Sequence, residues 1–291
     1  MPLKHGLYGG ICGNIIGIAC YDNKVFYSGY TNESIASMMQ YYSCDSVLVL
    51  SVASAISELK NKLPMYWHTT NMYDNVIEET LIQKLEYYTR KYNHISYGDM
   101  FVRWINSADH MPYNSFGNGS AIRAAYIGWV GNSMSEVEKM AEISARISHN
   151  HPEGVAGAKA VAGSIFLLRS GKTKIDVKNY VGRYYNMDFS LSSIKAPLEF
   201  DATCQQTVPY AIAACLEKNE SYVDVVRAAS SLYGDMDTIP CIAGSIAEAL
   251  YDVPSSIIRK AQSVIGEELS MISLLYACIA SSHNALQSSS E

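Results

Sequence analysis

The stretch GDMDTIPCIAGSIAEAL, residues 234–250, joins a set of oxygen-bearing side chains to an apolar segment of small residues. Small side chains let neighbouring helices approach closely, so we expect residues 241–250 to form a central helix. Asp235 and Asp237 are two residues apart, a spacing that would splay them on a helix but lets them converge from an irregular loop. With Thr238, they predict a helix beginning that carries ligands for a hard cation.

Helical periodicity extends through most of the chain. Apolar residues recur at intervals of three and four in several segments, which is typical of amphipathic helices. The stripes are Leu48, Val52, Ala55, Ile56 and Leu59; Val76, Ile77, Thr80, Leu81 and Leu85; and Val137, Met140, Ala141, Ser144 and Ile147. Because no strand alternation persists, the pattern predicts an all-α, compact multi-helix bundle. We expect residues 1–280 to form a single domain and residues 281–291 a flexible C-terminal tail.

Helix beginnings are marked by capping signals. Ser96 to Asp99, Ser133 to Glu136 and Ser221 to Asp224 have the spacing of a capping box. Pro254 suits the first turn of a helix. A second segment rich in Ala and Gly, residues 156–168, predicts another central helix.

Composition excludes several functional classes. The chain has 291 residues, of which 48% are hydrophobic and 17% charged, with a net charge of −6. A nucleic-acid backbone requires clustered Lys and Arg, so we expect no extended nucleic-acid surface. No apolar run is long enough for a membrane span, which predicts a soluble protein without a membrane partner. Seven cysteines without CxxC spacing predict reduced, buried thiols and a cytoplasmic location.

A second helix beginning, residues 43–46, also carries oxygen ligands. If the two beginnings converge, carboxylates and hydroxyls together form the donor set that Mg²⁺, Mn²⁺ or Ca²⁺ accept. The candidate metal ligands are Ser43, Asp45, Asp235, Asp237 and Thr238. Taken alone, the same residues also fit simple helix caps, because Asp and Ser are common at helix starts.

Two further segments indicate ligand contacts. In residues 115–120, glycines permit close backbone approach and the amides before a helix can hold phosphate, although such a loop is also common as a plain turn. In residues 148–154, two imidazoles lie two residues apart at a helix boundary. No third ligand stands at zinc-site spacing, so we expect hydrogen bonding to a ligand or a helix end.

Taken together, the order and separation of these segments resemble the ADP-ribosylglycohydrolase family over roughly residues 6 to 268. The segments that carry the resemblance are GGICGNIIG (9–17), SCDSVLVLSVASAI (43–56), SFGNGSAIRAAYIGW (115–129), ARISHNHPEGVAGAKAVAGSIF (145–166), FDATCQQTVPYAIAACLE (200–217) and YGDMDTIPCIAGSIAEALY (233–251). The resemblance implies an orthogonal all-α bundle with a cleft for two Mg²⁺ or Mn²⁺ ions. It also implies removal of ADP-ribose from a modified side chain or a small acceptor.

The resemblance assigns roles to particular positions. The family's metal signatures read Thr-Asp-Asp-Thr and Gly-Gly-Asp-x-Asp-Thr, which places Ser43, Cys44, Asp45, Asp235, Asp237 and Thr238 at ligand positions. The candidate substrate-binding residues are Ser115, Gly117, Asn118, Gly119, His149 and His151. The candidate catalytic carboxylates are Asp45, Asp235 and Asp22, the last as a stand-in base.

Several positions depart from the family pattern. Cys44 stands where the family has aspartate, Ser43 replaces threonine, Tyr233 replaces glycine, and Asn14 replaces aspartate. A thiol is a poor Mg²⁺ ligand. We therefore expect one firmly held ion and a second site that is weak or absent.

Three functions follow from these observations. The leading one is a metal-dependent hydrolase that releases ADP-ribose from a protein adduct or a small conjugate. The alternative is an impaired relative that binds or sequesters ADP-ribose or a related nucleotide without turnover. The third is a structural helical protein without a ligand, which is disfavoured because clustered carboxylates are costly to keep without a cation.

Overall fold

The computed structural model describes residues 6–24, 30–64, 70–194, 198–218 and 220–288, with side chains up to residue 273. Its helices are α1 (Tyr8–Asn23), α2 (Asn32–Met38), α3 (Cys44–Lys62), α4 (Asp74–Lys91), α5 (Asp99–Ile105), α6 (Gly119–Arg123), α7 (Ala125–Val130), α8 (Met134–Arg146), α9 (Pro152–Arg169), α10 (Lys174–Val181), α11 (Cys204–Glu217), α12 (Tyr222–Ser230), α13 (Thr238–Ala247) and α14 (Ser255–Ser288). Short 3-10 turns occupy Asn71–Tyr73 and Leu191–Ser193. Within these residues β pairing is limited to two isolated bridges, so the all-α prediction is confirmed.

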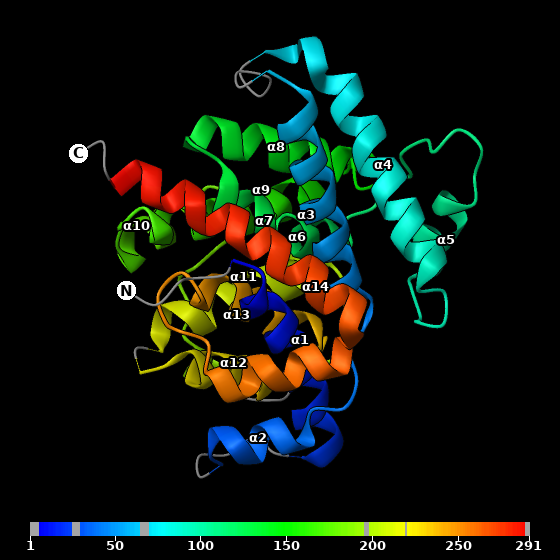
Figure 1. The fold of residues 1–291 in the computed structure, drawn as a ribbon. Helices are drawn as coiled ribbons and strands as arrows, with labels where there is room; N and C mark the ends of the chain where they lie inside the picture. The colour runs from blue at the N-terminus through cyan, green and yellow to red at the C-terminus, as the bar shows by residue number, and fades with distance from the viewer. Residues whose placement is uncertain (1–5, 25–29, 65–69, 195–197, 219, 289–291) are drawn as a thin grey trace.

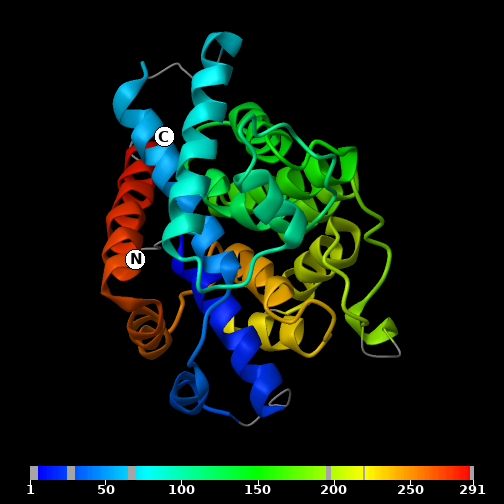
Figure 2. The ribbon, with the colours of Figure 1, turned by 90° about the vertical axis from the view of Figure 1, so that its right-hand side faces the viewer.

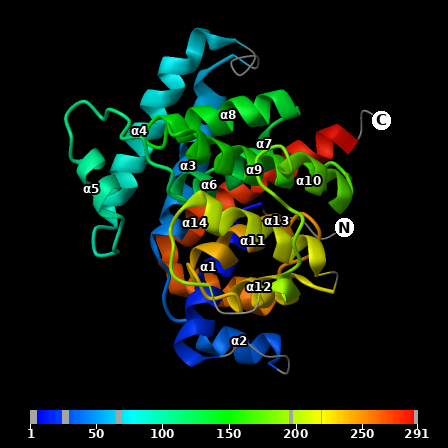
Figure 3. The same ribbon diagram turned by 180° about the vertical axis from the view of Figure 1, so that it is seen from behind.

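Two helices organise the bundle (Figure 1). Helix α13 packs against α1, α11 and α12, and α9 packs against α6, α7, α8 and α10. Because α11 contacts both α13 and α9, it joins the two groups. Helix α14 bends at Gly266, where φ is 82°, and packs on α2 and α3. Helices α4 and α5 project from one side of the bundle, as opposite views show (Figures 1 and 3).

Helices α1 and α13 are in direct backbone contact. Glycines of α1 recur at three- and four-residue intervals and so share one face. A Cβ at Gly13 would lie 2.2 Å from the carbonyl oxygen of Pro240, and one at Gly9 would lie 2.4 Å from that of Gly244. A side chain at either position would therefore push the two helices apart. These glycines of α1 are thus a packing surface for α13.

The carboxylate of Glu248 secures one end of this contact. Its two oxygens accept hydrogen bonds of 2.8 Å from the amides of Gly6 and Gly9, at the beginning of α1. A buried anion is favourable there because the first amides of a helix lack intrahelical partners and carry partial positive charge. The hydroxyl of Tyr222 adds a hydrogen bond to the carbonyl of Gly9. Helices α12 and α13 therefore both fix the start of α1.

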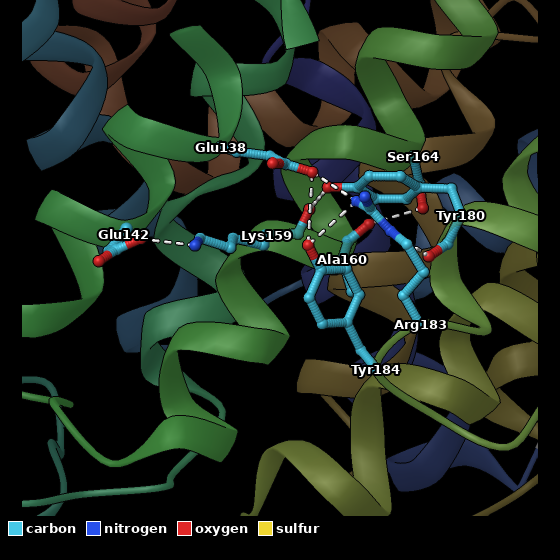
Figure 4. Close-up of polar contacts among 8 residues, drawn as sticks. All are labelled: Glu138, Glu142, Lys159, Ala160, Ser164, Tyr180, Arg183 and Tyr184. Carbon is cyan, nitrogen blue, oxygen red and sulfur yellow. Dashed lines mark hydrogen bonds and ion pairs between the residues drawn. The ribbon is translucent and has the colours of Figure 1, made fainter. Parts of the chain in front are cut away.

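A polar network fastens the outer helices α8, α9 and α10 to one another (Figure 4). Arg183 donates to the carboxylate of Glu138 and lies 4.3 Å from the centre of the Tyr180 ring. Tyr180 in turn donates to the carbonyl of Lys159, whose ammonium pairs with Glu142. These contacts hold α10 against the α8–α9 pair, and the turn between α8 and α9 carries His149, which lines the cavity described below.

Most of the expected core stripes are buried. The stripe in α3 and the stripe in α8 and the turn that follows it are buried throughout, which confirms both predictions. In α4 the residues from Ile77 onward are buried, but Val76 is 41% exposed. Including Val76 in that stripe was wrong. Successive residues of an α-helix are about 100° apart around its axis, so Val76, next to Ile77, lies off the narrow face that packs against α3.

Capping predictions were partly correct. Ser133 and Ser221 are the N-cap residues directly before α8 and α12. The hydroxyl of each accepts a hydrogen bond from the backbone amide three residues later. The Ser96 prediction was wrong: Gly98 precedes α5 in extended conformation and no side chain caps that helix. Pro254 lies one residue before α14 instead of inside its first turn.

The structure bears on the predictions for the cysteines, for membrane spans and for the C-terminal tail. Cys12, Cys20, Cys44, Cys204, Cys215 and Cys241 are free thiols, and all but Cys44 are buried. None of the described helices has the length and hydropathy required to span a bilayer. Helix α14 carries the backbone of residues 281–288, while residues 289–291 lie outside the described part. Because side chains beyond residue 273 are not described, flexibility of the tail stays a prediction.

The glycine contact yields a direct test. Replacing Gly13 with Ala should lower the free energy of unfolding by ~3 kcal/mol, because the new Cβ meets rigid backbone of α13. Gly98→Ala is the matched control, since a Cβ there has nothing within 4 Å. Urea unfolding of both variants measures the difference. Equal stabilities would show that α1 and α13 are not in contact at this point.

Candidate functional site

Two helix beginnings distant in sequence meet in the structure. Asp45 lies in the first turn of α3, and Thr238 is the first residue of α13. The hydroxyl of Thr238 donates a 2.9 Å hydrogen bond to Oδ2 of Asp45. Asp45 is 2% exposed and Asp235 is 5% exposed, so both carboxylates are largely withdrawn from water. The predicted convergence of the two segments is therefore present.

A tight turn directs Asp235 toward this junction. Tyr233 and Gly234 both have positive φ, 62° and 65°, immediately before it. Such angles are inexpensive only for glycine, so Tyr233 holds a conformation that the glycine expected at this position in the family pattern would adopt freely. Nδ2 of Asn118 donates a 2.7 Å hydrogen bond to Oδ2 of Asp235. The amide of Asn118 thus links the glycine loop to the carboxylate cluster.

Asn14 organises the beginning of α3. Its Nδ2 donates to Oγ of Ser43 at 2.7 Å, and its Oδ1 accepts from the Ser43 amide and the Ser46 hydroxyl, both at 3.0 Å. Ser43 Oγ also accepts from the Asp45 amide at 3.4 Å. Both acceptor positions of the Ser43 hydroxyl are therefore engaged in this structure. Asn14 contributes a neutral hydrogen-bond network where the family pattern has a carboxylate.

The carboxylates strongly perturb one another. Burial raises the pKa of Asp45 well above its ordinary value, and the charges of Asp237 and Asp235 raise it further. Burial and then Asp237 raise the pKa of Asp235 to about 7. Burial, followed by Asp45, also raises the pKa of the Cys44 thiol, which keeps it protonated. Like charges held together without water favour a bound cation or a shared proton.

The donor set fits a hard cation in its chemistry. Asp45, Asp235 and Asp237 provide carboxylate oxygens whose mutual repulsion a divalent ion would relieve. Among the described residues, however, no three or more His, Cys, Asp or Glu side chains are already arranged as a metal-binding group. An ion here would need the Thr238 hydroxyl, water or substrate oxygens as well, which suits Mg²⁺ because it retains several waters.

The cluster opens onto a cavity of about 590 Å³. One wall consists of Asp45, Asp235, Asp237 and Thr238, and another of the glycine loop and His149. The region around α5 contributes a third wall, and Figure 2 shows that side of the molecule. The remaining lining residues are Cys44, Leu48, Tyr97, Gly98, Asp99, Met100, Phe101, Arg103, Tyr113, Ile122, Arg123, Phe200 and Ala202. The volume is in the range of small-ligand sites.

The glycine loop is braced rather than free. The Asn118 amide donates to the carbonyl of Ala202 at 2.8 Å, and the Cys204 amide donates to the carbonyl of Phe116 at 2.9 Å. Oγ of Ser115 accepts from the Gly117 amide. Of the predicted substrate residues, Ser115, Gly117, Asn118, Gly119 and His149 all line the cavity. The structure thus brings this part of the prediction together beside the carboxylates.

Three predicted site residues, Ser43, His151 and Asp22, do not line the cavity. His151 caps α9 by accepting from the Glu153 amide, and its ring packs on Phe116, 5.2 Å between ring centres. His151 is not among the cavity-lining residues. Asp22 is exposed in the last turn of α1, two helical turns beyond Asn14, or about 12 Å along the axis. The described cavity lining does not include Asp22.

Sequence reasoning passed over several lining residues. Arg123 is fully buried behind the loop, while Tyr113 and Phe200 flank it. Arg123 lies within the segment that carries the family resemblance, yet an arginine among apolar residues has no periodic or spacing signal of its own. Tyr113 and Phe200 have no feature in the sequence that distinguishes them from the rest of the 22 tyrosines and 6 phenylalanines.

Comparison with known proteins agrees with this geometry. The family profile described as ADP-ribosylglycohydrolase matches residues 4–277. The chain belongs to the ADP-ribosylglycohydrolase family. A solved structure titled "ADP-ribosylglycohydrolase-related protein complex" superposes with a TM-score of 0.65 at 16% identity, covering 96% of this chain and 100% of that chain. At this identity the likeness shows the fold alone. A sequence search among curated proteins gives no significant match.

Membership of the ADP-ribosylglycohydrolase family confirms the resemblance and supports a hydrolase activity on ADP-ribose conjugates in general terms. Metal dependence, the acceptor and retention of turnover are finer questions. They depend on how this chain's own departures, Cys44 and Asn14, alter the site.

Asp235 should make stability depend on pH. Its folded pKa of about 7 exceeds the 3.8 of a free aspartate, so at intermediate pH the native state binds more protons than the unfolded state. Without a bound cation, stability should therefore fall as pH rises through that interval. Asp237→Asn removes one cause of the raised pKa and should shrink the loss. Thermal unfolding from about pH 5 to pH 8, with a chelator present, measures the loss of stability. If stability falls with pH as steeply in Asp237→Asn as in the wild type, the raised pKa of Asp235 is not its cause.

Proposed function

We propose that this protein is a Mg²⁺- or Mn²⁺-dependent hydrolase that releases ADP-ribose from a modified protein side chain or a small conjugate. The observation that carries the proposal is the meeting of Asp45 and Asp235 beside a cavity that the glycine loop also lines. One wall offers buried anions for a cation. The other part of the lining offers the His149 imidazole for an anionic ligand, beside the glycine loop, whose Gly117 and Asn118 amides donate hydrogen bonds within the protein.

Asp45, Asp235, Asp237 and Thr238 would hold the cation. When bound, a divalent ion would stabilise negative charge developing on substrate and water oxygens. Because the Cys44 thiol stays protonated and Asn14 is neutral, the site has fewer anionic donors than the family pattern. This supports one firm ion and a second site that is weak or absent.

Asp235 is the carboxylate best placed to move a proton. Without a bound cation, burial and Asp237 raise the pKa of Asp235 to about 7. A bound cation would favour the ionised carboxylate, which is the form that accepts a proton. The Asn118 hydrogen bond fixes the orientation of one carboxylate oxygen, and the side chains of Asp237 and Thr238 also hydrogen-bond to Asp235. Asp22 lies outside the cavity lining, so we give the role of base to Asp235.

A second candidate function is binding without turnover. It is favoured by one specific observation: Asn14 and Ser43 satisfy each other by hydrogen bonds where the family pattern supplies metal ligands. The cavity would then sequester ADP-ribose or a related nucleotide. Calorimetric titration with ADP-ribose, with and without Mg²⁺, followed by assays of ADP-ribose release from modified arginine and serine peptides, separates the two. Binding without release would select the second function.

Metal binding can be tested by one substitution. Asp237→Ala should abolish the increase in melting temperature that Mg²⁺ or Mn²⁺ produces, because the cluster loses its least buried carboxylate donor. Asp99→Ala is the control, since Asp99 lines the same cavity outside the cluster and should leave the increase intact. A melting response to Mg²⁺ that survives in Asp237→Ala would defeat the assignment.

Restoring the missing carboxylate should strengthen the site. Cys44→Asp returns an anionic oxygen to a position beside Asp45, so Mg²⁺ affinity should rise roughly tenfold and turnover should increase. Cys44→Asn is the matched control, because it has the same shape as aspartate without the charge. Calorimetry with Mg²⁺ measures the change. Equal affinities in the two variants would show that residue 44 does not contribute to cation binding.

A further inference from the structure

Arg123 is a fully buried cation in the lining of the cavity. Its Nη2 donates to the carbonyls of Ser144 and Ala145, at 2.5 and 3.2 Å, and to Oγ of Ser148 at 2.8 Å. Among the described residues, its Nε and Nη1 have no hydrogen-bond partner. Burial lowers the pKa of Arg123 to about 10, which still leaves the guanidinium charged at neutral pH.

Ser148 joins this cation to His149. Oγ of Ser148 lies 2.8 Å from Nδ1 of His149. Because a guanidinium can only donate, Ser148 must accept from Arg123. Among the described residues, the acceptor within reach of its own proton is Nδ1 of His149, which must be unprotonated to receive it. The opposite arrangement would leave the proton of a fully buried hydroxyl without an acceptor, which costs about 1–3 kcal/mol.

The other ring nitrogen of His149 faces the glycine loop. A Cβ built at Gly117 or at Gly119 would lie 3.5 Å from Nε2, so the absence of side chains at both positions keeps this nitrogen uncovered. His149 itself lines the cavity. Burial, and then the charge of Arg123, lower the pKa of His149 well below its ordinary value, so the ring is neutral.

We propose that Arg123 and Ser148 are positioning residues that hold His149 as a neutral imidazole with its proton on Nε2, so that it donates a hydrogen bond to an anionic oxygen of the ligand. The identity of that ligand as a nucleoside diphosphate sugar rests on the proposed function; the tautomer does not. The arrangement separates two tasks. The fixed positive charge stays on Arg123, which is connected to His149 through the Ser148 hydroxyl. His149 supplies a directional hydrogen-bond donor.

Nitrogen-15 NMR of histidine-labelled, ligand-free protein tests the tautomer directly. His149→Gln assigns the resonances. We expect Nδ1 of His149 to show the shift of an unprotonated nitrogen and Nε2 that of a protonated one at neutral pH. A proton on Nδ1, or an imidazolium, would overturn the proposal whatever the protein binds.

Ser148→Ala tests the relay, with Ser144→Ala as its matched control. Ser144 is equally buried, its carbonyl contacts Arg123, and its hydroxyl has no hydrogen-bond partner among the described residues. Ser148→Ala should release the tautomer, giving signals of both forms, and weaken ADP binding about tenfold. Ser144→Ala should change neither. Equal losses in the two variants, or an unchanged tautomer in Ser148→Ala, would show that Ser148 has only a structural role.

ADP as the probe separates this inference from the proposed function. ADP carries the anionic oxygens but no bond to hydrolyse, so binding is measured without turnover. If the wild-type protein has the proton of His149 on Nε2 but does not bind ADP, the proposal that His149 donates to an anionic ligand is overturned. If ADP binds and no conjugate is hydrolysed, the relay stands while the hydrolase proposal falls.

Discussion

The direct backbone contact between α1 and α13 is the constraint on which the rest of the structure depends. Glycines on α1 let the carbonyls of Pro240 and Gly244 come within reach of its backbone, and Glu248 ties the amides of Gly6 and Gly9 at one end. This contact places Asn14, the residue after Gly13, next to the beginning of α3. Asn14 then orients Ser43, and Asp45 meets Thr238 at the start of α13. A packing requirement in the core thus determines where the carboxylates converge.

The carboxylate cluster is costly to the folded protein in the absence of a counter-charge. Asp45 and Asp235 are both buried, and each is close enough to Asp237 for its pKa to rise. Burial of paired charges without compensation opposes folding, and such groups concentrate at functional sites. Asn14 and the protonated Cys44 reduce the negative charge at the positions where the family pattern has aspartates. These two residues therefore lower the electrostatic repulsion within the cluster of carboxylates.

The glycine loop and His149 give another part of the cavity lining neutral groups, with the buried cation Arg123 beside them. The glycine loop is braced by hydrogen bonds to the segment before α11, so its conformation does not depend on a ligand. Behind it, Arg123 closes the end of α8 through the carbonyls of Ser144 and Ala145. Preorganised donors need little rearrangement on binding, which favours recognition of a charged ligand. The lining of this single cavity therefore includes both buried carboxylates and a buried guanidinium.

The amino-acid sequence by itself determined the helical class, the two helix beginnings with oxygen ligands, the glycine loop and the family. Each of these depends on residues close together in the chain, where three- and four-residue periodicity and capping preferences act. Tertiary structure alone decided that Val76 is exposed, that Asp22 lies outside the cavity lining, and that Arg123 stands behind His149. Such relations depend on how helices distant in sequence pack, because burial and long-range contact leave no trace in local spacing. For the same reason, the sequence supplied the carboxylates of Asp45 and Asp235, and only the contact of α1 with α13 and the turn at Gly234 brought them to one place.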